Sequence, residues 1–251
     1  MKKIITIILL LCSCIMLEAR KIYVTRHAQV GAKNIKHAAS GEYMITPLGK
    51  KQAELLADYL VNVKKFNGTI FVSPFYRTIE TGLITAGKLN KKVILEPGIQ
   101  EIAPHGKGKF MKSAQIAEYF SDQAVPGTTF NDNWRLSHED NTARQLRVDK
   151  AIERILEEST GDILLVSHGG TCSNIVRTFN TKAASGVKPV KGMPWNCALF
   201  TFELDTDGKV TRAYYTTEYM TDDIVTNNFR TPKVAKPDDQ RYEKTKKKKY
   251  L

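Results

Sequence analysis

The stretch KIYVTRHAQV, residues 21–30, places Arg26 and His27 side by side at the point where an apolar strand ends. Its Ile, Tyr and Val side chains favour a short buried strand. A strand that ends on an arginine and a histidine puts both at the edge of a sheet, where α/β proteins carry their functional groups. These ten residues therefore predict one strand of the core and a first pair of site residues.

Beyond residue 30 the pattern alternates between helix and strand. Thr46 can cap a helix that has Pro47 at its first position. Further helices are expected from about Tyr76, over 141–159 and from about Gly170. Strands are expected over 68–74, 91–97, 161–168, 197–205 and 209–217. A mixed region extends from 106 to 141. This alternation predicts an α/β fold in which a largely parallel central sheet carries helices on both faces.

Polar side chains follow three of the expected strands at the same edge of this sheet. Arg26 and His27 end the first strand, Ser73 ends the second with Arg77 one turn later, and His168 follows a later strand. Guanidinium groups match phosphate oxygens bidentately. A neutral imidazole among them can attack phosphorus. The joint occurrence predicts a cationic pocket for a phosphoryl group.

Four segments make the sequence similar to the histidine phosphatase superfamily, the phosphoglycerate mutase-like group that carries an RHG motif. They are TRHAQ at 25–29, ITPLGKKQA at 45–53, VSPFYRTIETG at 72–82 and VSHGG at 166–170. EPGIQEIAPHG at 96–106 and MPWNCALFTFELDTDG at 193–208 match more loosely. The segments occur in the family's order over residues 21–216, which covers nearly all of the expected domain at 20–230.

The resemblance implies a three-layer α/β sandwich, with no metal or organic cofactor, and roles for six residues. His27 would be the nucleophile and Glu101 the proton donor, although Glu96 lies close enough in sequence to be an alternative acid. Substrate-binding residues would be Arg26, Arg77, His168 and Asn34. Asn34 lies eight residues after Arg26, whereas the family's asparagine lies seven after its arginine. Ala28 and Gln29 stand where the family usually has glycine and glutamate.

The function that the resemblance implies is phosphomonoester hydrolysis through a phosphohistidine, on a small phosphorylated substrate, with free phosphate as the other expected ligand. A phosphoglycerate mutase-type phosphotransferase would use the same pocket residues. A non-catalytic phosphoryl-binding protein is the third alternative, raised by the sequence RHAQ in place of RHG. Residues 105–145, where the family usually determines its substrate, match no subfamily pattern, so the physiological substrate stays open.

Residues 1–19, MKKIITIILLLCSCIMLEA, have the pattern of a signal peptide, with a buried first helix as the alternative. A positively charged start precedes an apolar run of 14 residues, whereas a membrane span needs roughly 20. Cleavage after Ala19 is favoured over lipidation at Cys14, which the lipobox-like LCSC would permit. The mature protein is therefore expected to be exported, to the periplasm or the extracellular space.

Charge and cysteine content limit the kinds of partner and of cysteine site that the chain can be expected to have. The formal net charge of +12 is uneven, because residues 231–251 hold eight Lys or Arg against three Asp or Glu. The moderately basic body suits small anions, and no nucleic-acid partner is expected. We expect the tail to be disordered and solvated, with weak contact to anionic surfaces as the alternative. Cys172 and Cys197, the cysteines outside the signal, are expected to be buried free thiols.

Overall fold

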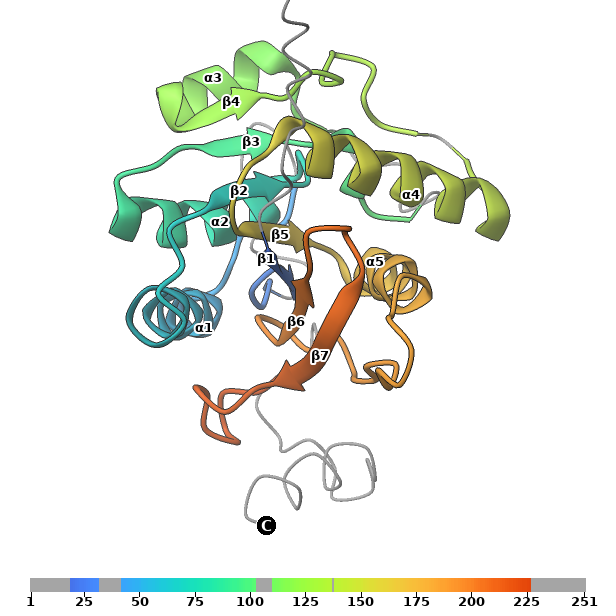
Figure 1. Ribbon diagram of the computed structural model, residues 1–251. Helices are drawn as coiled ribbons and strands as arrows, with labels where there is room; N and C mark the ends of the chain where they lie inside the picture. Colours follow the sequence, from blue (N-terminus) through green and yellow to red (C-terminus); the bar gives the residue numbers. More distant parts are fainter. Residues whose placement is uncertain (1–18, 32–41, 103–109, 137, 227–251) are drawn as a thin grey trace, which may run out of the picture.

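The computed structural model describes residues 19–31, 42–102, 110–136 and 138–226, which form one seven-stranded sheet flanked by helices (Figure 1). The strands are β1 (Arg20–Arg26), β2 (Thr69–Val72), β3 (Val93–Leu95), β4 (Ala124–Pro126), β5 (Ile163–Ser167), β6 (Leu199–Leu204) and β7 (Val210–Thr216). Their order is β4-β3-β2-β5-β1-β6-β7. The pairs among β4, β3, β2, β5 and β1 are parallel, and β6 and β7 are antiparallel additions. The predicted largely parallel sheet is confirmed.

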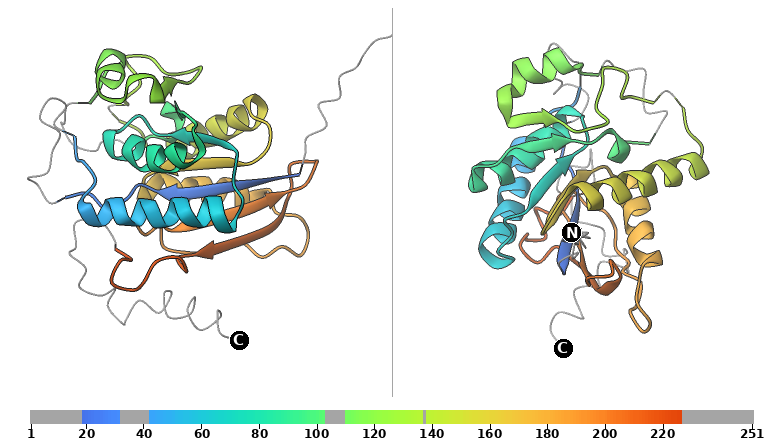
Figure 2. Two further views of the ribbon diagram at one scale, coloured as in Figure 1. Left: turned by 90° about the vertical axis from the view of Figure 1, so that its left-hand side faces the viewer. Right: turned by 45° about the horizontal axis from the view of Figure 1, so that its top comes forward.

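Helices cover both faces of the sheet, as the three-layer prediction requires. They are α1 (Pro47–Asp58), α2 (Tyr76–Leu89), α3 (Ser113–Phe120), α4 (Asn141–Glu158) and α5 (Gly169–Thr181). Figure 2 shows α1 and α2 on one face and α4 and α5 on the other. The mixed region supplies α3 and β4, whose existence the sequence pattern did not predict; they lie at the β3 edge of the sheet (Figure 1).

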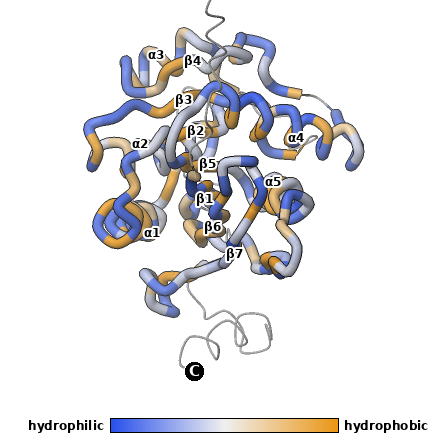
Figure 3. The backbone as a smooth tube through the Cα atoms, in the orientation of Figure 1, coloured by the Kyte–Doolittle hydropathy of each residue, from blue (hydrophilic) through white to orange (hydrophobic). Residues whose placement is uncertain are grey.

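The alternation of side chains along the central strands builds two hydrophobic cores. In β1, Tyr23 joins the core beneath α1 and α2, whereas Ile22 and Val24 join the core beneath α4 and α5. Successive side chains of a strand point to opposite faces, so a strand covered on both faces is apolar throughout. Figure 3 shows apolar residues along these central strands. The strand ends are thereby held in a rigid frame.

The start of α1 follows the sequence prediction and packs closely on the loop after His27. The Thr46 hydroxyl accepts a hydrogen bond from Gly49 N at 2.9 Å, and Pro47 occupies the first helical position. A Cβ atom added at Gly49 would lie 2.2 Å from the backbone oxygen of Gln29. A glycine is therefore needed here for close approach of the helix to that loop.

Some sequence predictions fall on residues 1–18, 32–41 and 227–251. Four predictions concern residues at or beyond the limits of the described segments. They are cleavage after Ala19, lipidation at Cys14, phosphate binding by Asn34 and the nature of the tail. Cys172 and Cys197 are both buried and free, which confirms that prediction. Within the described segments no helix has the length and apolar character that a membrane span requires.

We expect Gly49→Ala to destabilise the fold because the added methyl group must displace the Gln29 backbone. Overpacking of this kind costs about 1–3 kcal/mol, or about 2–4 °C of melting temperature per kcal/mol in a chain of this size. Gly87→Ala in α2 is the control, since nothing lies within 4 Å of a Cβ there; it should stabilise by about 0.4–1 kcal/mol. Equal effects of both substitutions on thermal unfolding would contradict the assigned contact.

Candidate active site

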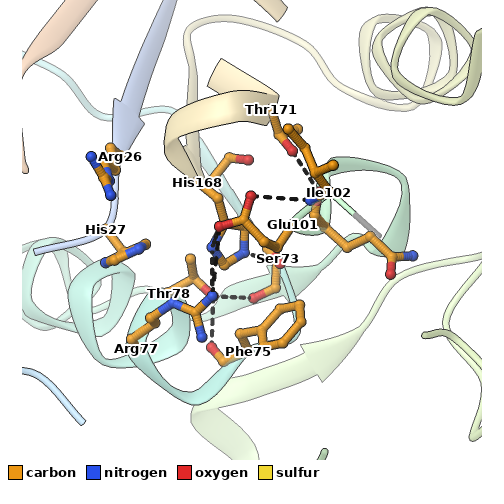
Figure 4. A network of polar contacts seen from close by, with 12 residues as sticks. Arg26, His27, Ser73, Phe75, Arg77, Thr78, Glu101, Ile102, His168 and Thr171 are labelled. Atoms are coloured by element: carbon orange, nitrogen blue, oxygen red, sulfur yellow. Dashed lines mark hydrogen bonds and ion pairs between the residues drawn. The ribbon is translucent and has the colours of Figure 1, made fainter. Parts of the chain in front are cut away.

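The sheet brings the three predicted strand ends to one place. β5 lies between β1 and β2, with Arg26 in register with Ser167, and Val72 with Val166. The residues that follow these positions therefore emerge at the same edge of the sheet. Figure 4 shows Arg26, His27, Arg77, Glu101 and His168 gathered there. The predicted grouping of two arginines and two histidines is observed.

The imidazole of His27 is buried and held in one orientation. Its backbone N donates to Ser167 O at 2.8 Å, and its Nδ1 lies 2.8 Å from Ala28 O. A carbonyl oxygen only accepts, so Nδ1 carries a proton and donates it to Ala28. The lone pair of a neutral ring is then on Nε2. The His27 and His168 ring centroids are 5.3 Å apart, which places His27 against the rest of the group.

The surroundings keep His27 neutral. Burial lowers its pKa well below the ordinary value of 6.5, and the charges of Arg77 and Arg26 lower it further. Both effects disfavour an added positive charge. Burial also lowers the pKa values of both arginines, but an arginine remains charged at neutral pH. The pocket therefore combines two cations with a neutral imidazole.

Arg77, His168 and Ser73 form a chain of hydrogen bonds. Arg77 Nη2 donates to His168 Nδ1 at 3.0 Å, and His168 Nε2 lies 2.8 Å from Ser73 Oγ. Arginine has no acceptor, so Nδ1 must carry the lone pair and Nε2 the proton. In this arrangement the hydrogen bond from Arg77 requires a neutral His168 ring. Ser73, to which the sequence assigned no role, accepts a hydrogen bond from Nε2 in this tautomer.

Glu101 reaches the same group from the segment after β3. Its Oε2 lies 3.5 Å from His168 Nδ1 and 3.9 Å from Arg77 Nη2, while Oε1 accepts from Ile102 N at 3.0 Å. The side chain is 17% exposed, so it faces both the buried group and solvent. Figure 4 shows its carboxylate beside the His168 ring. This is a suitable position for a proton donor.

Glu96, the alternative acid, is committed to a structural ion pair. Its side chain is buried, its Oε1 lies 2.7 Å from Arg154 Nη2, and the same oxygen accepts from Gly98 N at 2.6 Å. Within the part of the chain that the structure describes, Glu96 makes no hydrogen bond or ion pair with the pocket residues, whereas Glu101 contacts two of them. Of the two carboxylates, Glu101 is therefore the one that contacts the pocket residues.

Arg26 is held by backbone groups from distant parts of the chain. Its Nη1 donates to Pro194 O at 3.1 Å, and its own carbonyl accepts from Cys197 N at 3.1 Å. A Cβ atom at Gly169, in the first turn of α5, would lie 3.2 Å from the Arg26 Cζ. The first glycine of the VSHGG motif thus leaves space for this guanidinium.

Asn196 is a site residue that the sequence reasoning missed. It is fully buried, and its Nδ2 donates to the carbonyl oxygen of His27 at 2.8 Å. Its backbone N donates to Thr226 O at 3.0 Å, which ties the end of the described chain to the same loop. The residue lies within the loosely matched segment at 193–208, but a bond to a backbone carbonyl leaves no pattern in sequence.

Ala28 and Gln29, the two residues that depart from the family motif, both form hydrogen bonds in the structure. Ala28 N donates to Thr81 Oγ1 at 3.0 Å, and Gln29 N donates to Gln52 Oε1 at 2.8 Å. The side-chain oxygen of Gln29 accepts from the Thr46 hydroxyl at 2.7 Å, so it contacts the cap of α1. Both substitutions fit the loop after His27. Asn34 lies outside the described residues.

A metal site is not found among the residues that the structure describes. Within 19–31, 42–102, 110–136 and 138–226, no group of three or more His, Cys, Asp or Glu side chains is arranged to hold an ion. What the described pocket offers is two guanidinium groups, two imidazoles and one carboxylate. These groups can bind an anion, attack it and move a proton.

Comparison with known proteins identifies the family of this domain. Residues 22–217 match the model of the histidine phosphatase superfamily, branch 1. The ecdysone phosphate phosphatase of Bombix mori, solved with tungstate, is 18% identical with a TM-score of 0.58, covering 76% of this chain and 92% of that one. A mycobacterial glucosyl-3-phosphoglycerate phosphatase is 16% identical with a TM-score of 0.50, covering 84% and 100%. No curated protein matches. At such identities the structures establish the fold, and the family match shows that the chain belongs to the histidine phosphatase superfamily.

Proposed function

We propose that this protein is a phosphomonoester hydrolase that works through a phosphohistidine at His27. The observation that carries the proposal is a neutral imidazole with its Nε2 lone pair set among Arg26 and Arg77. A phosphate dianion is the natural ligand for two guanidinium groups in one place. The family membership and the phosphatases among its structural relatives support the same reaction class.

In the first step His27 Nε2 attacks phosphorus, and the bond from phosphorus to the leaving oxygen breaks. Arg26 and Arg77 stabilise the negative charge that spreads over the phosphoryl oxygens. An alkoxide leaves poorly, so Glu101 supplies a proton to the leaving oxygen. His168 Nδ1 lies 3.5 Å from Glu101 Oε2 and can take up a proton once Arg77 turns to the phosphoryl oxygens, and the protonated ring can then donate to the phosphoryl group.

In the second step a water molecule attacks the phosphohistidine. Glu101, now a carboxylate, takes a proton from the water, the nitrogen–phosphorus bond breaks, and phosphate leaves. One carboxyl group serves both half-reactions because it gives up a proton in the first and recovers one in the second. Its partial exposure suits this role, since water must reach it.

The two alternative functions, a mutase and a non-catalytic binding protein, would use the same pocket residues in different ways. A mutase would return the phosphoryl group to a second hydroxyl, and it would need to shelter the phosphohistidine from water. A non-catalytic binding protein would need no acid, yet Glu101 is placed 3.5 Å from His168. We propose hydrolysis, on a small phosphorylated substrate, with the basic tail at most in weak contact with anionic surfaces.

Export remains part of the proposal. The apolar segment that we assign to a signal ends at Ala19, and β1 begins at Arg20, directly after it. Removal of residues 1–19 would thus leave β1 whole. Export also favours hydrolysis over a mutase reaction, because the intermediates of central metabolism are cytoplasmic.

His27→Ala should abolish turnover of a nitrophenyl phosphate, and wild-type protein quenched without acid during turnover should carry one phosphoryl group on His27. The exposed His138 is the control, so His138→Ala should retain activity and label. Mass spectrometry of the labelled peptides makes the assignment. Label on His168 or on a serine would refute the proposed nucleophile.

The His27 ring should stay neutral at pH values where an ordinary histidine is half protonated. The sequence contains five histidines, and loss of one NMR signal in His27→Ala identifies its resonance. Because the folded pKa lies well below 6.5, this resonance should not shift between about pH 8 and pH 6. The unfolded chain does take up this proton, so His27 lowers the free energy of unfolding as pH falls below 6.5. A resonance that titrates near pH 6.5 would show that the ring is solvated.

Glu101→Gln should slow the turnover of alkyl phosphates by about 10²–10⁴-fold, the effect of a lost general acid. A nitrophenolate leaves without a proton, so formation of phosphohistidine from nitrophenyl phosphate should be affected much less. Its hydrolysis should still be slow, which predicts a pre-steady-state burst of nitrophenol. Glu96→Gln is the control: it breaks the pair with Arg154 and should cost stability with no dependence on the leaving group. Equal losses on both leaving groups in Glu101→Gln would assign Glu101 a structural role only.

A further inference from the structure

Glu42 is a buried carboxylate that has no part in the proposed reaction steps. Its Oε2 accepts a hydrogen bond from Tyr76 N at 2.6 Å, and its Oε1 accepts one from Met111 N at 3.1 Å. A charge withdrawn from water is costly unless it finds such partners. One side chain thus joins three separate segments of the chain, and one of its partners is the residue before Arg77.

The bond to Tyr76 N supplies a cap that helix α2 lacks in its own sequence. Phe75 occupies the N-cap position, its side chain makes no capping hydrogen bond, and the first turn contains no acidic residue. Helices α1 and α4, in contrast, are capped by their own Thr46 and Asp140. The first N–H groups of a helix have no partner within it, and a negative charge is stabilising at that end. Glu42, 34 residues earlier in the chain, provides both the acceptor and the charge.

The start of α2 positions Arg77 against the rest of the pocket. Arg77 lies in the first turn, and its Nη2 donates to His168 Nδ1 at 3.0 Å (Figure 4). Its carbonyl accepts from Thr81 Oγ1 at 2.7 Å, and the same hydroxyl oxygen accepts from Ala28 N at 3.0 Å. The first turn is therefore also bonded to the loop after His27. A shift of this turn would move Arg77 relative to the nitrogen that attacks phosphorus.

Charge strengthens the link between Glu42 and the helix start. Burial lowers the pKa of Arg77, and the charges of Glu101 and Glu42 act in the opposite direction. Burial raises the pKa of Glu42, and the bond from Tyr76 N and the charge of Arg77 act in the opposite direction. Both carboxylate oxygens accept from N–H groups, which favours the ionised form. Glu42 and Arg77 thus each stabilise the charged form of the other.

Glu80 forms a second link between the same two parts of the chain. Ile45 N donates to Glu80 Oε2 at 2.9 Å, so α2 and residues 42–45 each contribute one glutamate to their contact. Burial raises the pKa of Glu80 to about 7. Glu80 lies three residues after Arg77, where the N–H groups of a helix begin to find partners within it. Glu80 therefore shares the segment and the helix with Glu42, but it does not cap the helix.

We propose that Glu42 is a positioning residue of the phosphoryl pocket, which holds Arg77 in place by capping α2 from outside the helix. The inference rests on the proposed hydrolase function, which it deepens. Glu42 would not touch the substrate. It would act through Arg77, and therefore on binding of the phosphoryl group as well as on its transfer.

Glu42→Gln tests the inference. The amide keeps the shape of the side chain, but it has one acceptor oxygen instead of two and no charge. We expect kcat/KM for nitrophenyl phosphate to fall by at least about 10-fold, the effect of one lost hydrogen bond to a charged group, and the dissociation constant of inorganic phosphate to rise. Glu42→Asp keeps the charge on a shorter side chain and should lose less. Glu80→Gln is the matched control and should change both quantities by less than about threefold.

A double-mutant cycle shows whether Glu42 acts through Arg77. Arg77→Ala removes the guanidinium, so adding Glu42→Gln to it should lower kcat/KM by less than about a further threefold. Independent effects of the two substitutions would instead add. The cycle is also measured on the dissociation constant of inorganic phosphate, so that it can be completed if Arg77→Ala has no measurable turnover.

Three results would overturn the inference and leave the hydrolase standing. They are a loss in Glu42→Gln no larger than in Glu80→Gln, losses that add in the cycle, and tighter phosphate binding in Glu42→Gln, which would make the carboxylate a countercharge only. Melting temperatures identify a loss that comes from unfolding, and Glu42→Asp then replaces Glu42→Gln in the cycle. Absence of phosphohydrolase activity in the wild type on every substrate would overturn the function itself, and phosphate binding would still test the role of Glu42.

Discussion

The site depends on keeping one imidazole neutral among buried arginines. In water near neutral pH a histidine is partly protonated, and the protonated fraction cannot attack. Arg26 and Arg77 lie close enough to His27 to oppose a further positive charge, and burial acts in the same direction. The cations that would bind the phosphoryl group thereby also keep the His27 imidazole neutral. The Ala28 carbonyl then determines that the lone pair is on Nε2.

Burial of cations imposes a second requirement, because a guanidinium withdrawn from water must find other partners. Arg26 donates to Pro194 O, and Arg77 donates to His168 Nδ1 and packs on the face of Phe75. These partners come from separate connections around the sheet, so the pocket exists only in the folded chain. The same connections also hold the nucleophile, since Asn196, close to Pro194 in sequence, bonds the His27 carbonyl.

Much of this could be predicted from sequence, because strand ends in a parallel sheet share an edge and the apolar pattern marks each strand. The resemblance favoured Glu101 as the acid, but the exclusion of Glu96 could not be predicted, since it depends on Arg154, a residue 58 positions away that pairs with Glu96. The neutral state of His168 depends on the orientation of Arg77, and the role of Asn196 on a backbone oxygen. Helix α3 and strand β4 formed where periodicity was too weak to predict them.

Gln100 connects helix α5 with the segment that contains Arg135. Its carbonyl is bonded to α5, which begins directly after His168, and its side chain is bonded to the backbone on both sides of Arg135. Glu101 is the next residue. The leaving oxygen that needs the proton lies between the phosphoryl group and the rest of the substrate. Gln100 is thus fixed by hydrogen bonds to two separate segments, which holds the adjacent Glu101, the proposed acid, in place.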